Sequence, residues 1–244
     1  MKQTEDIRKE LAAELDRIKW ILSGLRMKGI QDWASPHPPP DADMPILEGN
    51  VSPPKSPEQA LQEIREELGD CKRCRLHEGR RHLVFGEGSA RPVLVFVGEG
   101  PGFDEDRQGR PFVGRAGKLL DKMIRSLGLE REQVYICNVV KCRPPNNRTP
   151  NPDEIDACSP FLTRQLTTLR PKVICALGAC AAQTLLGTSS AISKLRGKVH
   201  SWRGIPLVST FHPAYLLRNP AQKGATWQDL LIVHQILHAN EKDH

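Results

Sequence analysis

Two pairs of cysteines that lie far apart in the sequence constrain how this chain can fold. Cys71 and Cys74 form a C-x-x-C pair, and Cys142 and Cys158 follow much later, with fifteen residues between them. A close pair brings two sulfurs to one metal centre, and a distant pair fixes both ends of the loop between its members. That loop is rich in proline and asparagine, so it is not regular structure throughout. The spacing predicts an iron–sulfur cluster or a structural zinc site, with four unrelated buried thiols as the alternative.

The other three cysteines have a simpler interpretation. Cys137 and Cys175 lie in apolar, strand-like runs and Cys180 lies in a helix of small residues, so all three are expected in the core. Seven cysteines without an N-terminal secretory signal favour a reducing compartment, and we expect the cytoplasm. No apolar run approaches the length of a membrane span. The formal net charge of +6 is compatible with an anionic partner such as nucleic acid.

Composition divides the chain into three segments. Residues 1–34 are charged, and their apolar residues from Ile7 to Leu22 recur at helical spacing, which predicts an amphipathic helical extension. Residues 35–57 are dominated by proline and are typical of an extended linker. Residues 58–244 have the length of one globular domain with a full core.

Apolar runs alternate with helical stretches in this domain. The runs are Val93–Val97, Val134–Val140, Val173–Leu177 and Leu207–Thr210, and the helical stretches are Gly114–Leu127, Asp153–Leu169 and Ala179–Leu186. This alternation predicts an α/β fold with a central four-stranded, mainly parallel sheet flanked by helices. Ligand sites in such sheets lie beyond the carboxyl ends of the strands.

Three polar motifs stand at the predicted strand ends. They are GEGPGFDED (Gly98–Asp106), NVVKCRPPNNR (Asn138–Arg148) and FHPAYLLRNP (Phe211–Pro220). With the run GRPFVG (Gly109–Gly114) and the four cysteines, these motifs resemble the iron–sulfur, family 4 type of uracil-DNA glycosylase, essentially from Pro57 to Val233. The resemblance implies a DNA repair enzyme that flips uracil out of DNA and hydrolyses its N-glycosidic bond, leaving an abasic site. It also implies a [4Fe-4S] cluster on cysteines placed like Cys71, Cys74, Cys142 and Cys158.

Recognition of uracil gives several motif residues an expected role. The amide of Asn138 can donate to uracil O4 and accept from N3–H, whereas cytosine presents the opposite pattern. The resemblance places Phe112 as the ring on which the flipped base stacks, and Glu105 as the group that excludes the methyl of thymine. Gly102 stands where the best-known uracil glycosylases carry a tyrosine. Gly100, expected beside the substrate, stands where they carry an aspartate, so the conventional general-base assignment does not carry over to this position.

Cleavage of the bond requires charges or dipoles of both signs. His212, as a neutral imidazole, is expected to donate a hydrogen bond to uracil O2, and Glu99 and Asn147 to orient water or offset cationic charge near the sugar. The alternative for Asn138 is a strand-end asparagine that caps a turn, and the alternative for His212 is an ordinary His-Pro turn. Asp104 and Asp106 are expected in a solvated acidic loop.

DNA contacts are expected on the rims of the same site. Arg115 and Lys118 open a helix whose first amides can meet a phosphate. Leu216 or Leu217 is expected to fill the gap left by the flipped base, with Arg218 on a phosphate, and the alternative is that both leucines begin a buried helix.

We therefore expect a monomeric enzyme that acts on single- or double-stranded uracil-containing DNA, with the N-terminal helix as the candidate contact for a replication or repair protein. A relative of this family traps its substrate through a histidine in a basic insertion between the last two cysteines. This chain has no such insertion, so turnover is expected. The competing functions are an iron–sulfur electron carrier and a noncatalytic iron–sulfur DNA-binding module. The first leaves Asn138, Phe112 and His212 unexplained, and the second leaves a pocket for one base unexplained.

Overall fold

The computed structural model describes residues 56–239. The predicted N-terminal helix and nearly all of the predicted linker lie outside these residues, so the division at residues 34 and 57 stays a prediction. No helix in the described part of the chain is both long enough and apolar enough to cross a bilayer.

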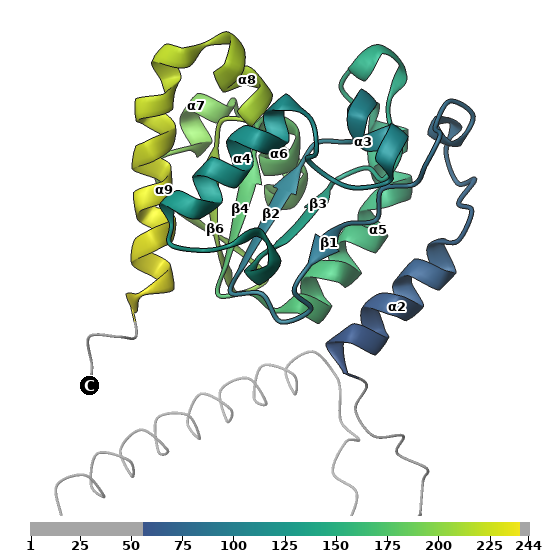
Figure 1. Ribbon diagram of the computed structural model, residues 1–244, viewed down its shortest axis with the longest axis horizontal. Helices are drawn as coiled ribbons and strands as arrows, with labels where there is room; N and C mark the ends of the chain where they lie inside the picture. Colours follow the sequence, from purple (N-terminus) through teal and green to yellow (C-terminus); the bar gives the residue numbers. More distant parts are fainter. Residues whose placement is uncertain (1–55, 240–244) are drawn as a thin grey trace, which may run out of the picture. The chain divides into compact units, whose positions relative to one another are not determined.

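A mixed six-stranded sheet in the order β1-β3-β2-β4-β6-β5 forms the centre of the domain (Figure 1). Its strands are β1 (Glu87–Gly88), β2 (Leu94–Gly98), β3 (Tyr135–Asn138), β4 (Val173–Leu177), β5 (Val199–Trp202) and β6 (Ile205–Thr210). The four inner strands are parallel, and both edge strands are antiparallel to their neighbours. The predicted four-stranded parallel core is confirmed. The edge strands escaped prediction because β1 has two residues and β5 is mostly exposed rather than apolar.

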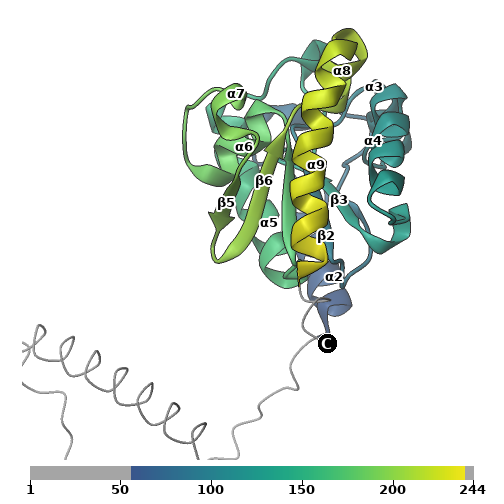
Figure 2. The ribbon, with the colours of Figure 1, turned by 90° about the vertical axis from the view of Figure 1, so that its left-hand side faces the viewer.

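Helices cover both faces of this sheet. They are α2 (Pro57–Leu68), α3 (Phe103–Gln108), α4 (Arg115–Ser126), α5 (Pro152–Leu169), α6 (Ala179–Leu186), α7 (Ile192–Leu195), α8 (Pro213–Arg218) and α9 (Lys223–Leu237). Short 3₁₀ turns occur at Arg75–His77, Arg131–Gln133, Pro145–Asn147 and Pro220–Gln222. Figure 2 shows α4 and α9 on one side of the sheet and α5, α6 and α7 on the other.

The core consists of two apolar layers, one on each face of the sheet. In β2, Val95 and Val97 pack into the layer under α5, whereas Leu94 and Phe96 pack into the layer under α4 and α9. Successive strand residues point to opposite faces, and all five residues of β2 are buried, because helices cover both sides. This burial explains why the inner strands are continuous apolar runs in the sequence.

The inner strands place the polar motifs at one edge of the sheet. β3 ends at Asn138, two residues before the predicted end, yet the chain stays bound to the segment that follows β2. Val139 N donates to Gly98 O at 2.9 Å and Val140 N donates to Glu99 O at 3.1 Å. The first and second motifs therefore lie side by side.

Candidate active site

A pocket of about 410 Å³ opens at the carboxyl ends of the inner strands. Its lining includes eight of the predicted site residues, which come from all three motifs and from the run before α4: Glu99, Gly100, Glu105, Phe112, Asn138, Asn147, His212 and Arg218. Further lining residues that the sequence did not single out are Pro101, Ala116, Pro144, Arg148, Thr149, Ala214 and Tyr215. Their participation depends on tertiary arrangement, and three of them, Pro101, Ala116 and Arg148, directly follow a predicted residue in the chain.

Asn138 carries an unsatisfied polar atom into this pocket. Its side chain is 1% exposed, and its Oδ1 has no hydrogen-bond partner within the described residues. A buried amide oxygen without a partner costs free energy, on the order of 1–3 kcal/mol, unless a ligand satisfies it. The arrangement therefore suits a ligand that brings an N–H group to this position.

Phe112 is held beside Asn138 in a conformation that few residues adopt. Its φ of 50° lies in the left-handed region, and its ring centroid is 5.5 Å from that of His212. Two glycines make room for it. A Cβ at Gly98 would lie 2.6 Å from Phe112 Cζ and 2.4 Å from Asn138 Oδ1, and a Cβ at Gly117 would lie 1.9 Å from Phe112 O. A residue larger than glycine at position 98 or 117 would therefore displace Phe112 or the Asn138 amide.

His212 is the N-cap of α8, and its protonation state follows from its surroundings. Its Nδ1 accepts a hydrogen bond of 3.1 Å from Ala214 N, so the neutral ring carries its proton on Nε2. Burial lowers the pKa of His212 to about 4, and the positive charge of Arg218 acts in the same direction. His212 is therefore a neutral hydrogen-bond donor at neutral pH.

Glu99 contributes a carboxyl group, and therefore a possible negative charge, to the same pocket. Burial raises the pKa of Glu99, and a hydrogen bond from Thr149 partly offsets this effect. Asn147 is exposed at the pocket rim with φ of 54°, and its Oδ1 accepts a hydrogen bond of 2.8 Å from Arg143 Nε. A carboxylate that burial disfavours and an anchored amide thus border the same cavity.

The glycines at positions 100 and 102 leave no room for side chains. A Cβ at Gly100 would lie 2.8 Å from Val140 Cγ2, and a Cβ at Gly102 would lie 2.7 Å from Glu105 Oε2. Glu105 therefore occupies the space that a side chain at position 102 would need. Neither an aspartate at 100 nor a tyrosine at 102 fits without movement of these neighbours.

The carboxylate of Glu105 is engaged by backbone amides. Oε1 accepts from Val113 N and Gly114 N, both at 2.9 Å, and Oε2 accepts from Gly102 N at 3.2 Å. These bonds tie the start of α3 to the segment that carries Phe112. Glu105 lines the pocket, as expected. The hydrogen bonds of its carboxylate hold the Phe112 segment in place. Its role in excluding the methyl group of thymine stays a prediction.

Asp106 does not lie in a solvated loop, and that expectation was wrong. It is 2% exposed, and its Oδ1 accepts hydrogen bonds from Arg81 N at 2.8 Å and His82 N at 3.4 Å. A carboxylate can be buried when backbone amides satisfy it, and sequence alone does not identify such amides. Asp106 joins α3 to the loop that follows the first cysteine pair.

The predicted DNA-contacting residues lie around the α4 and α8 rim. Arg115, Lys118 and Arg218 are exposed. Glu105 engages the amides of Val113 and Gly114, which precede α4, so the amides of the first turn of α4 are left for a phosphate.

The two leucines of α8 differ in exposure. Leu216 is 1% exposed, as the buried-helix alternative expects, so it presents no wedge to DNA and its predicted role was wrong. Leu217 is partly exposed.

The four paired cysteines come together beside α5. Cys142 belongs to the core layer under α5, and Cys71, Cys74 and Cys158 pack against that layer. Burial raises the pKa of Cys142 to about 11 and also raises the pKa values of Cys74 and Cys158. Without a cation to replace the proton, these sulfurs stay protonated at neutral pH.

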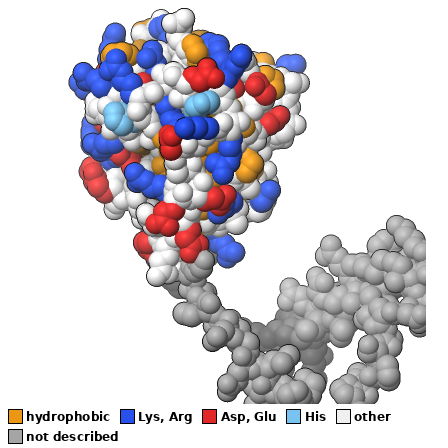
Figure 3. All heavy atoms as spheres, turned by 90° about the vertical axis from the view of Figure 1, so that its right-hand side faces the viewer, with side chains coloured by type: hydrophobic (Ala, Val, Ile, Leu, Met, Phe, Trp, Pro, Cys, Tyr) orange, Lys and Arg blue, Asp and Glu red, His pale blue; other side chains and the backbone are white. Residues whose placement is uncertain are grey.

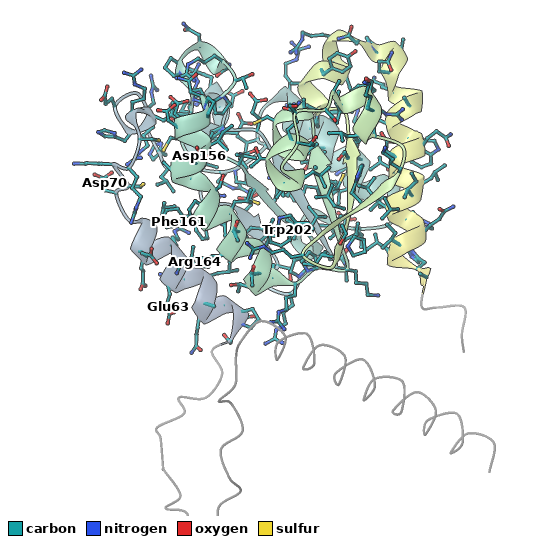
Figure 4. The ribbon with its side chains drawn as sticks, turned by 180° about the vertical axis from the view of Figure 1, so that it is seen from behind. Glu63, Asp70, Asp156, Phe161, Arg164 and Trp202 are labelled. Atoms are coloured by element: carbon teal, nitrogen blue, oxygen red, sulfur yellow. The ribbon has the colours of Figure 1, made fainter. Side chains whose placement is uncertain are left out.

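Arginines next to these cysteines supply such positive charge. Arg80 Nη1 donates to Cys142 Sγ at 3.1 Å and to Cys71 O at 2.7 Å, which bridges the two cysteine pairs. Its other nitrogen is 2.6 Å from Asp70 Oδ1. Figure 4 labels Asp70 on the loop after α2 and Phe161 on α5, and the Phe161 ring lies 4.9 Å from the Arg73 guanidinium.

Lys141 is a second buried cation in this region. It is 1% exposed, and its Nζ donates to Asn138 O at 2.8 Å and to Gln165 Oε1 at 2.6 Å. Lys141 has no carboxylate partner among residues 56–239, and its charge acts to lower the pKa of Cys158, against the effect of burial. Four thiols beside Lys141, which no carboxylate neutralises among the described residues, and beside Arg80, fit a group that carries negative charge once the thiols ionise.

Within residues 56–239 no three His, Cys, Asp or Glu side chains are grouped as a single metal ion requires. The four cysteines, with Arg80 and Lys141 beside them, are the residues that could hold a metal group in this region.

Comparison with known proteins gives consistent matches. Residues 85–231 match the model of the Uracil DNA glycosylase superfamily. The chain is 51% identical over 164 residues to a type-4 uracil-DNA glycosylase of Thermotoga maritima, which covers 66% of this chain and 85% of that protein. It is 46% identical over 186 residues to one of Sulfurisphaera tokodaii, covering 72% and 84%. A third, from Archaeoglobus fulgidus, is 45% identical over 170 residues, covering 66% and 85%.

Proposed function

The chain belongs to the uracil DNA glycosylase superfamily and to its type-4 members, and we propose that Asn138, Phe112 and His212 perform its excision of uracil from DNA. The observation that carries this assignment is the unpartnered, buried Oδ1 of Asn138 beside the Phe112 ring. A flipped uracil offers that oxygen its N3–H group and offers the ring its flat face. Cytosine has no hydrogen on N3 and would leave the oxygen unsatisfied.

Cleavage of the N-glycosidic bond moves negative charge onto uracil and positive charge onto the sugar. His212 is neutral and carries its proton on Nε2, so it donates to uracil O2 without a prior change of protonation. A hydrogen bond to a charged group is worth about 1.5–3 kcal/mol, more than one to the neutral base, so the bond favours the departing anion.

Glu99 supplies the opposite charge. Because burial disfavours its ionised form, the carboxylate gains most when a cation develops next to it. In the same proposal, Asn147 orients the attacking water at the pocket rim, held by Arg143. In this proposal no aspartate is needed at position 100, where a Cβ would lie 2.8 Å from Val140 Cγ2.

We assign a [4Fe-4S] cluster to Cys71, Cys74, Cys142 and Cys158. When bound, it serves as a structural cross-link between the loop after α2, the end of the second motif and α5. Arg80 and Lys141 offset the negative charge of the four thiolates. Because Lys141 also binds the backbone of Asn138, the cross-link supports the base pocket.

The substrate is uracil-containing DNA, and the finer features stay proposals. They are a monomeric enzyme at work in the cytoplasm and a replication or repair protein that contacts the N-terminal segment. Whether the preferred substrate is single- or double-stranded is measured directly in the assay below.

One assay tests the assignment. Oligonucleotides with uracil, thymine or cytosine at one position, single-stranded or paired, are incubated with the protein and treated with alkali to open abasic sites. We expect cleavage only at uracil. Asn138→Asp should reduce it by at least a hundredfold, because an ionised carboxylate no longer donates to O4. If Asn138→Asp excised uracil as fast as the parent protein, Asn138 would not be the residue that reads the base.

A further inference from the structure

Phe103 is an exposed aromatic side chain at the edge of the candidate active site. It is the first residue of α3 and is 49% exposed, and it directly follows Gly102, which lines the pocket. Two guanidinium groups lie near its ring: that of Arg143 lies 5.1 Å from the ring centroid and that of Arg81 lies 5.8 Å from it. An exposed aromatic ring next to two cations is a suitable binding surface for a ligand that has a flat face and a negative charge.

The structure holds this group in place from both sides. Asp106, on α3, accepts hydrogen bonds from the backbone amides of Arg81 and His82. Arg143 is anchored by its bond to Asn147, which lines the pocket. The backbone at Arg81 and the side chain of Arg143 are therefore positioned before any ligand arrives, which lowers the entropy cost of binding.

Neither of these two arginines is neutralised by a carboxylate within the described residues. Other arginines near α3 are: Arg107 lies 3.9 Å from Asp104, and Arg110 lies 2.8 Å from Glu87. Arg81 forms no such pair, and the side chain of Arg143 donates only to a neutral amide. Both charges are therefore available to an anion.

This group lies on a different rim from the DNA contacts expected on α4 and α8. Figures 1 and 2 show α3 and α8 as two separate helices at the same end of the domain. Figure 3 views the face on the right of Figure 1 and shows Lys and Arg side chains over its upper part, with hydrophobic and some acidic side chains among them, and a further group of Asp and Glu side chains at its lower end. A strand whose uracil occupies the pocket leaves it in two directions, and α3 borders one of them.

We propose that Phe103, with Arg81 and Arg143 beside it, is a stacking platform for a base of the single-stranded DNA next to the extruded uracil. The ring offers a face to the base, and the two guanidinium groups meet the phosphates on either side of it. This inference rests on the proposed function, because the pocket fixes which ligand passes over α3. A base inside a duplex is stacked on both sides and presents no free face, so the platform serves single-stranded rather than double-stranded flanks.

The first test measures binding without excision. Fluorescence anisotropy follows a labelled, uracil-free single-stranded 20-mer and its duplex as they bind the full chain carrying its cluster. We expect Phe103→Ala to weaken binding of the single strand about tenfold and of the duplex less than threefold, and Phe103→Trp to restore it. Arg81→Ala should weaken both and reduce the salt slope by about one, a slope that Phe103→Ala leaves unchanged.

Two exposed residues away from the pocket serve as matched controls. Arg125→Ala removes a cation from the last turn of α4, and Trp227→Ala removes an aromatic side chain that is 43% exposed on α9. Both should leave binding of the single strand within about twofold of the parent protein. Equal losses from Phe103→Ala and Trp227→Ala would overturn the platform, as would equal losses on single strand and duplex.

The second test locates the contact along the strand. Uracil oligonucleotides are shortened from either side, and KM and kcat are measured for each. Phe103→Ala should raise KM about tenfold with kcat unchanged, and the effect should vanish when one flank is removed and persist when the other is removed. If the effect persists without either flank, Phe103 acts on the pocket, and the platform is rejected. If the parent protein binds DNA yet excises no uracil, the proposed function fails, while the anisotropy still decides the platform.

Discussion

Lys141 Nζ lies 2.8 Å from the backbone carbonyl oxygen of Asn138, so a buried cation next to the cysteine set supports the residue assigned to reading the base. The same ammonium group donates to Gln165, whose amide nitrogen in turn donates to Phe85 O at 3.0 Å. No carboxylate neutralises Lys141 within the described residues. Its charge is explained when the cysteines hold a negatively charged cluster.

Lys141→Met should therefore affect both sites at once. It removes the charge with little change in side-chain length, so we expect faster bleaching of the cluster's visible absorption in air and at least tenfold slower excision, since a charged hydrogen bond is worth about 1.5–3 kcal/mol. Absorption, iron content and single-turnover rates measure the two effects. Lys172→Met, which removes an exposed lysine just before β4, is the control. Slow excision with fully stable colour would show that Lys141 acts on Asn138 alone.

Gly98→Ala should damage the pocket more than the fold. Its Cβ would lie 2.4 Å from Asn138 Oδ1 and 2.6 Å from Phe112 Cζ, so one or both side chains must move. We expect excision to fall about a hundredfold, because catalysis depends steeply on the placement of the bound base. Gly224→Ala, in α9 with open space around its Cβ, should instead leave excision unchanged and stabilise the fold by roughly 0.5–1 kcal/mol. Rates and thermal unfolding of the two variants make the comparison.

Glu105 has two roles to separate, holding the Phe112 segment and excluding the methyl of thymine. Glu105→Gln keeps the shape but replaces one accepting oxygen with a donor that faces amides, so the segment loses support in both Glu105→Gln and Glu105→Ala. Both should slow uracil excision at least tenfold. Only Glu105→Ala opens space beside C5, so only this variant should raise the ratio of thymine to uracil excision. If the ratio of thymine to uracil excision were the same in the two variants, Glu105 would only hold the Phe112 segment and would not exclude the methyl group.

Much of the fold was predictable because the inner strands are buried on both faces and their apolar runs are continuous. The polar lining of the pocket was located for a related reason: those residues directly follow the strands. Burial of charged residues was not predictable. Lys141, Arg80 and Asp106 are interior or nearly so because particular carbonyls, sulfurs and amides meet them, and such partners become neighbours only in the folded chain. The prediction that Leu216 inserts into DNA was wrong for a different reason: an apolar residue near a site more often packs in the protein core than is presented to a ligand.

The pH dependence of excision should depend on Glu99 and not on His212. Burial raises the pKa of Glu99 above its usual value of 4.5, so an essential carboxylate is lost as pH falls through that raised value, earlier than for an exposed glutamate. Burial lowers the pKa of His212 to about 4, so its ring stays neutral from pH 5 upward and adds no step there. Single-turnover rates between pH 5 and 9, with the cluster's absorption recorded at each pH, measure this profile. We expect the acid limb to disappear in the slower Glu99→Gln variant and to persist in the equally slow His212→Asn variant. An acid limb that vanishes with His212→Asn instead would assign the titration to the imidazole and remove Glu99 from the catalytic step.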